Sequence, residues 1–293
     1  MKADLLIDAQ NTLGEGVQWN ADHRRVWWTD IHGCALWSCD ADGGSVETIK
    51  TQERLGCFAF DAQNRILAAF ESGLYRWDLE ADRVELISAF EPDHPTSRMN
   101  DGRCDRQGRL VAGGIDEKGL TPTSSVVRYD GQQTATVMTD VRCANSICFS
   151  PDGKWMYFAD SPTRVIQRIP YDPETGDMGD VEIFYTVDPK GGVPDGSCVD
   201  AEGALWNARF GGGIVQRILS DGSEDLVVEV DAPQVTCACF GGNDLDRLFI
   251  TTARESLSQP ELEAKPLSGG LFVCEPGFRG LPEDRFAASL FSG

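Results

Sequence analysis

Residues 147–158 read ICFSPDGKWMYF, two short apolar runs separated by a polar turn. Asp and Gly in the turn favour a chain reversal, because Asp bonds to nearby backbone amides and Gly accepts positive φ. Apolar runs on both sides of such a turn predict a β-hairpin. The same pattern recurs five more times, at residues 17–28, 58–68, 103–112, 197–207 and 238–250.

A third apolar segment follows each hairpin. These segments lie at residues 35–38, 74–77, 126–129, 165–168, 214–217 and 271–274. Most of them lead through a polar turn into a fourth segment, such as residues 84–87 and 227–230. Four strands in a unit of about 45 residues, repeated six times, are typical of a β-propeller.

We therefore predict an all-β fold, a six-bladed β-propeller, in which residues 5–7 complete the last blade. A different all-β arrangement is the alternative. No segment has a helical periodicity long enough to compete, and no linker divides the chain. Residues 1–293 are accordingly expected to form a single domain, although two domains are common at this length.

The chain is strongly acidic. It has 26 Lys and Arg residues against 47 Asp and Glu residues, which gives a formal net charge of −21. Such a charge repels phosphate backbones and anionic lipids, so nucleic acid and membrane surfaces are not expected partners. The 41% of hydrophobic residues is enough to build a core and excludes disorder of the whole chain.

Two features indicate a reducing compartment. Residues 1–7 hold one basic residue and too short an apolar stretch for a signal peptide. The ten cysteines are scattered, and several lie in strand-like runs such as residues 236–240, which suits buried, reduced thiols. No Cys-x-x-Cys pair is present, so a structural zinc site is not expected. We predict a cytoplasmic protein.

Polar residues recur where the innermost strands begin. These strands line the channel of a propeller, so residues at one register converge on its axis. Four of the six strands carry an oxygen-bearing side chain there: Glu15, Asn100, Asn145 and Asp195. The other two carry small residues, Gly56 and either Thr236 or Cys237, which we interpret as leaving room for a ligand.

Two carboxylates and two amide oxygens gathered in this way suit a hard divalent cation such as Ca²⁺, Mg²⁺ or Mn²⁺. Without a cation, the two carboxylates would repel each other. The alternative is that Asn-Asp-Gly at residues 100–102 and Pro-Asp-Gly at residues 194–196 are only turn signals.

The sequence lacks the motifs of several other classes of enzyme. There is no Gly-x-Ser-x-Gly elbow, no His-Glu-x-x-His and no Gly-x-x-x-x-Gly-Lys, and the chain has only three histidines. His94 lies in the loop that leads to Asn100 and could reach the channel mouth. We nevertheless interpret it as a solvated loop histidine.

At these residues the sequence resembles the family of SMP-30, gluconolactonase and related sugar lactonases. The matching stretches are residues 13–16, 98–102, Asn145 with 150–153, and 194–200, together with the tail segments 269–272 and 280–282. Each motif is short, but their order and spacing are specific and extend over essentially the whole chain. The resemblance is greatest to bacterial lactonases of pentose and hexose catabolism.

The resemblance implies a six-bladed propeller with one divalent metal in its channel. It implies that Glu15, Asn145 and Asp195 hold the metal, and that Arg98 and Asn100 contact the sugar. The identity of the metal stays open among Ca²⁺, Mg²⁺, Mn²⁺, Zn²⁺ and Fe²⁺. Family members also tend to have an acidic residue after the third inner hairpin. The corresponding residues here are Asp116 and Glu117, which are candidates only.

The implied activity is hydrolysis of a sugar-acid lactone, of pentono- or hexonolactone size, to the aldonic acid. A bound metal would polarise the ester carbonyl, and Asp195 is the expected general base, with a role as ligand only as the alternative. Two other functions stay open. One is a related metal-dependent esterase or organophosphate hydrolase, and the other is a non-catalytic calcium-binding propeller.

Overall fold

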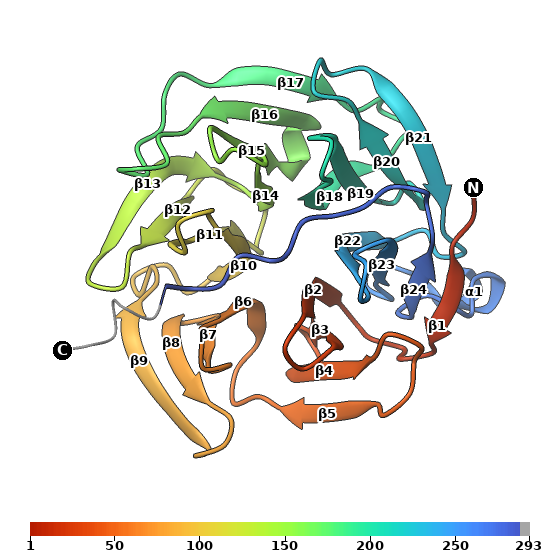
Figure 1. Ribbon diagram of the computed structural model, residues 1–293, viewed down its shortest axis with the longest axis horizontal. Coiled ribbons are helices and arrows are strands. Elements are labelled where there is room, and N and C mark those ends of the chain that lie inside the picture. The colour runs from red at the N-terminus through yellow and green to blue at the C-terminus, as the bar shows by residue number, and fades with distance from the viewer. Residues whose placement is uncertain (288–293) are drawn as a thin grey trace.

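Six four-stranded antiparallel sheets surround a central axis in the computed structural model, which describes residues 1–287 (Figure 1). Blade 1 comprises β2 (Gly14–Asn20), β3 (Arg25–Asp30), β4 (Ala35–Asp40) and β5 (Glu47–Lys50). Blade 2 comprises β6 (Leu55–Phe60), β7 (Ile66–Phe70), β8 (Gly73–Asp78) and β9 (Arg83–Ala89). Blade 3 comprises β10 (Ser97–Cys104), β11 (Leu110–Asp116), β12 (Ser124–Tyr129) and β13 (Thr134–Val141).

The remaining blades follow the same order from the axis outward. Blade 4 comprises β14 (Ala144–Phe149), β15 (Trp155–Asp160), β16 (Val165–Pro170) and β17 (Glu182–Thr186). Blade 5 comprises β18 (Val193–Val199), β19 (Leu205–Phe210), β20 (Ile214–Ile218) and β21 (Glu224–Glu229). Blade 6 comprises β22 (Val235–Gly241), β23 (Arg247–Thr252), β24 (Leu271–Cys274) and β1 (Asp4–Ile7). Two short helices, η1 (Ser161–Thr163) and α1 (Gln259–Ala264), lie in connecting segments.

The predicted all-β fold, a six-bladed β-propeller, is confirmed. β1 pairs antiparallel with β24, with Leu5 opposite Phe272, so the start of the chain completes the last blade as expected. The predicted single domain, residues 1–293, extends over residues 288–293, which lie outside the described part of the chain. No helix within residues 1–287 has both the length and the apolar character needed to cross a membrane.

An aspartate closes the turn after the innermost strand in three blades. Asp61 Oδ1 accepts hydrogen bonds from the backbone amides two and four residues later, at 2.9 Å each. Asp105 and Asp200 do the same in blades 3 and 5. The turn residues that predict the hairpins therefore act through side-chain bonds to the backbone, which compete well with other local conformations.

Apolar packing between neighbouring blades forms the core. β6, β14 and β22 are buried along their whole lengths. Aromatic pairs join adjacent sheets, such as Trp27 with Phe60 and Trp206 with Phe240, both with ring centroids 5.4 Å apart and edge to face. All ten cysteines are unpaired, and nine of them are buried, as the sequence indicates.

Residues 279–287, the C-terminal strap, cross one end of the channel (Figure 1). Backbone hydrogen bonds tie the strap to four blades. They join Ala201 N to Arg279 O, Gly280 N to Leu245 O, Phe286 N to Phe60 O and Ala287 N to Gly108 O, at 2.7 to 3.0 Å. The strap thus lies over the end where the first and second strands of each blade are joined, away from the predicted site.

Candidate functional site

Each of the six innermost strands has a break in register near its start. The breaks fall between residues 15 and 18, 55 and 57, 99 and 101, 145 and 148, 194 and 197, and 235 and 237. Such bulges bend a strand and re-aim its side chains, and they are frequent beside active sites. Here the ring of bulges turns the polar residues of the innermost strands toward one end of the channel.

All five predicted site residues line one pocket of about 290 Å³ at this end: Glu15, Arg98, Asn100, Asn145 and Asp195. The rest of the wall is largely apolar and includes Leu13, Ile115, Leu120, Pro162, Val193 and Phe210. Ser161, Glu255 and Ser256 add polar groups. An apolar pocket with a few convergent polar groups is the usual form of a small-molecule site.

The carboxyl groups of Glu15 and Asp195 meet in this pocket. Each accepts a hydrogen bond from the amide of the following glycine, at 3.0 Å and 3.1 Å. Burial raises the pKa of Glu15, and the charge of Asp101 raises it further. The pKa of Asp195 is also raised, first by burial and then by the charge of Glu15, to which its carboxyl group is hydrogen-bonded. Two such carboxyl groups must share a proton or bind a cation.

Asn145 completes a set of three oxygen donors. Its Nδ2 donates to Ser161 Oγ at 2.8 Å, while its Oδ1 accepts from Asn100 Nδ2 at 3.4 Å. Within residues 1–287 no three His, Cys, Asp or Glu side chains gather so that they could hold a metal ion. A cation here would therefore depend on the amide oxygen as well as on the two carboxylates, and this all-oxygen set fits a hard dication.

Arg98 is held rigidly at the pocket wall. Its side chain is almost completely buried, with Nε donating to Glu117 Oε1 at 2.7 Å and Nη1 donating to Asn100 Oδ1 at 2.7 Å. Asn100 in turn donates to the carbonyl oxygen of Ala144 at 2.9 Å, which links blade 3 to blade 4. Both groups are therefore oriented before any substrate binds.

The two acidic candidates after the third hairpin have different surroundings. Glu117 accepts hydrogen bonds from Arg98 and, at 2.9 Å, from Arg54. It therefore fixes the position of Arg98 but does not itself line the pocket. Asp116 accepts hydrogen bonds from Thr96 and Thr121 and organises its own loop. The hydroxyl of Thr121 is the main cause of the lowered pKa of Asp116.

The expectation that small residues leave room for a ligand at this register is wrong. Gly56 does not leave room for a ligand, because a Cβ there would lie 2.5 Å from the carbonyl oxygen of Met99. Its small size instead allows blades 2 and 3 to pack closely. The hydroxyl of Thr236 is not available to a ligand either, since it donates to the carbonyl oxygen of Gly14. His94 is exposed and is not part of the pocket wall.

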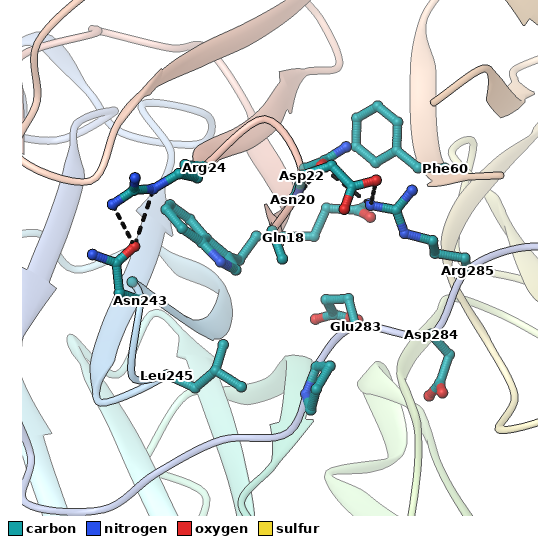
Figure 2. Close-up of a pocket in the computed structure, with 14 residues that line it drawn as sticks. Gln18, Asn20, Asp22, Arg24, Phe60, Asn243, Leu245, Glu283, Asp284 and Arg285 are labelled. Carbon is teal, nitrogen blue, oxygen red and sulfur yellow. Dashed lines mark hydrogen bonds and ion pairs between the residues drawn. The ribbon is translucent and has the colours of Figure 1, made fainter. Parts of the chain in front are cut away.

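A second cavity, of about 400 Å³, lies at the other end of the channel between blades 1 and 6 and the C-terminal strap (Figure 2). Its two arginines are held by polar or acidic neighbours. Arg24 donates to Asn243 at 2.8 Å, and Arg285 pairs with Asp22 at 2.9 Å. Since the sequence places no predicted site residue here, the pocket around Glu15 is the candidate site.

Comparison with known proteins identifies the family of the chain. A family model described as the SMP-30/gluconolactonase/LRE-like region matches residues 13–254. The chain belongs to this family. All five predicted site residues lie inside the matched SMP-30/gluconolactonase/LRE-like region, whereas the C-terminal strap lies outside it.

Relatives within the family include named lactonases. L-arabinolactonase from Azospirillum brasilense is 40% identical, over 98% of this chain and 96% of the relative. 6-Deoxy-6-sulfogluconolactonase from Pseudomonas putida is 35% identical, over 96% of this chain and 97% of the relative. The crystal structure of regucalcin from Agrobacterium tumefaciens, described as a calcium-binding protein, superposes with a TM-score of 0.93 at 32% identity and covers 98% of this chain and 97% of that one.

Proposed function

We propose that the protein hydrolyses a sugar-acid lactone, of pentono- or hexonolactone size, to the open-chain aldonic acid with the help of a divalent metal ion. The observation that carries the proposal is the meeting of Glu15 and Asp195 beside Asn145 in a pocket that Arg98 also lines. One cavity thus holds both the residues that would bind a metal ion and a residue that would bind a polyol.

Glu15, Asn145 and Asp195 would hold the metal. A dication bound there supplies Lewis acidity, which polarises the ester carbonyl and stabilises the oxyanion. Asp195 acts as the general base. One oxygen of its carboxylate would bind the metal, and the other would take the proton from the attacking water.

The bonds change in a simple order. The water oxygen bonds to the carbonyl carbon, the ring ester C–O bond breaks, and the ring oxygen leaves as the hydroxyl of the open acid after receiving the proton that Asp195 took from the water. Arg98 orients the sugar by donating hydrogen bonds to its oxygens, and Asn100 contacts the sugar beside it. Because both side chains are held by Glu117 and by the backbone of Ala144, little rotational freedom is lost on binding.

The relatives support the substrate class. L-arabinolactonase and 6-deoxy-6-sulfogluconolactonase, as their names state, act on sugar lactones, and both align over nearly the whole chain. The calcium-binding regucalcin structure supports a dication, although Ca²⁺, Mg²⁺, Mn²⁺, Zn²⁺ and Fe²⁺ all remain candidates. The same structure favours the second candidate function, a calcium-binding propeller without turnover.

A panel of aldonolactones assayed with metal analysis of the purified protein tests the proposal. We expect turnover of pentono- or hexonolactones, loss of turnover after chelation and recovery with one or more of the dications. Bound calcium without turnover of any lactone would favour the calcium-binding function. Turnover of aryl esters or organophosphates in preference to lactones would favour the related hydrolase. The cytoplasmic location stays a prediction, and cell fractionation tests it.

A further inference from the structure

A buried hydrogen-bond network lies directly behind the pocket and joins blade 4 to blade 5. Ser146 Oγ and Ser197 Oγ are 2.5 Å apart, and Asn207 Nδ2 donates to both, at 3.1 Å and 2.8 Å. All three side chains are at most 1% exposed. Ser146 directly follows Asn145 in β14, and Ser197 lies two residues after Asp195 in β18.

Arg209 sets the orientation of this network. Its Nη1 donates to Asn207 Oδ1 at 2.5 Å, so the amide nitrogen of Asn207 must face the two serines. The carbonyl oxygen of Asp195 lies 2.9 Å from the same nitrogen, so the two hydrogens of the amide are shared among this oxygen and the two hydroxyls. Among residues 1–287, no carboxylate lies within ion-pair distance of this buried guanidinium, and its Nη2 has no hydrogen-bond partner.

The backbone at Ser146 shows that the network carries a cost. Its φ is +63°, in the left-handed region that a glycine adopts freely and a serine does not. In blade 1, Gly16 follows Glu15 with nearly the same φ, +57°. A serine at this place in blade 4 is therefore explained by its hydroxyl, which bonds to Ser197 and Asn207.

We propose that Ser146, Ser197 and Asn207 are positioning residues that hold Asn145 and Asp195 at the separation a divalent cation requires. The two ligand residues belong to different sheets, so no ladder of backbone hydrogen bonds fixes the distance between them. The network connects the two bulges that present the ligands, next to a second bridge that runs from Asn145 Nδ2 through Ser161 Oγ to the carbonyl oxygen of Pro194. Partners behind metal ligands commonly change metal affinity ten- to a hundredfold.

This inference rests on the metal site of the proposed function, and metal binding without substrate tests it. Calcium and manganese titrations by calorimetry are compared for the wild type, Ser146→Ala, Ser146→Gly and Ser197→Ala. Ser146→Gly removes the hydroxyl while keeping the left-handed φ free of strain, so its fold should survive. Ser38→Ala is the matched control, because Ser38 is also buried and accepts hydrogen bonds from Arg25, in blade 1.

We expect the three network variants to bind the cation at least about tenfold more weakly, while Ser38→Ala binds it like the wild type. The double variant Ser146→Ala/Ser197→Ala should lose less than the product of the two single losses, because both serines act through Asn207. Melting temperatures of the metal-free proteins show whether each variant is folded.

Affinities within twofold of the wild type in folded network variants would overturn the inference and leave the lactonase proposal intact. Weaker binding in the variants together with a wild type that binds metal but hydrolyses no lactone would support the inference and reject the lactonase. A wild type that binds no dication would reject both.

Discussion

Glu15 of blade 1 and Asp195 of blade 5 share a hydrogen bond between their carboxyl groups at one end of the channel. Neither carboxyl group has a positively charged partner within ion-pair distance in the described structure. Burial and mutual repulsion raise the pKa of Asp195. An arrangement that costs stability in isolation is favourable around a dication, which is why we place the chemistry of this protein here.

Replacing Asp195 by Asn should reduce lactone turnover by at least about 100-fold, because the amide cannot accept a proton from water. The variant should remain folded, since an uncharged group in this pocket removes one of two repelling carboxylates. Initial rates and a melting curve of the same preparation measure both effects. Wild-type turnover in the variant would remove Asp195 as the base.

The pocket should discriminate against anionic lactones. With a dication balancing Glu15 and Asp195, the remaining carboxylate on the wall is that of Glu255, and among residues 1–287 the one lining cation, Arg98, is paired with Glu117. Repulsion between like charges in a partly enclosed site lowers the affinity for a substrate bearing phosphate or sulfonate. We expect neutral aldonolactones to have the higher kcat/KM, a difference from the sulfogluconolactonase relative.

Glu255→Gln should raise kcat/KM for the anionic lactones by about fivefold relative to the neutral ones. Glu255 lies at the rim and contacts His32 at 3.1 Å, so the change alters charge with little change in packing. Glu275→Gln, at an exposed position outside the pocket, is the control. An unchanged ratio between the two substrate classes would show that this carboxylate does not select for charge.

The C-terminal strap should contribute to stability through one ion pair. Glu283 binds the Arg103 guanidinium inside the channel, where both side chains are more than four-fifths buried. Glu283→Gln leaves that guanidinium without a counter-charge and should lower the free energy of unfolding by about 3 kcal/mol. Glu182→Gln breaks the exposed pair with Arg168 and should cost less than about 1 kcal/mol in the same denaturant titration. Equal losses would contradict a special role for the strap.

The strap should also make stability depend on pH. Burial raises the pKa of Asp284 from its ordinary 3.8 to about 6, against the opposing charge of Arg106. The folded state then holds this proton to higher pH than the unfolded state does, so this carboxyl's contribution to stability falls as pH rises from about 4 to about 6. Asp284→Asn should remove that decline. The free energy of unfolding of the wild type minus that of the variant should therefore fall over this interval. A rise in this difference would contradict the raised pKa of Asp284.

The fold could be predicted because its signals are local. Each hairpin needs two apolar runs and a turn residue such as Asp105, whose carboxylate bonds to amides only a few residues away. The position of Glu15, Asn145 and Asp195 in one pocket also followed from register, because equivalent positions in the blades of a ring converge.

The remaining features depend on partners that are distant in sequence. Nothing local to Ser146 indicates that Asn207 donates to it, and Gly56 suggests open space until the backbone of blade 3 is seen against it. The bulges were missed because a change of pairing register leaves no mark in composition. The strap has no strand pattern, and its bonds go to four different blades.

The central claim is that Glu15, Asn145 and Asp195 bind one divalent cation. Anomalous diffraction from crystals grown with Mn²⁺ tests it most directly. The account predicts a single strong anomalous peak between the oxygens of these three side chains, and its loss in Glu15→Gln crystals. A peak elsewhere with none at this point, or a peak that persists unchanged in Glu15→Gln, would contradict it.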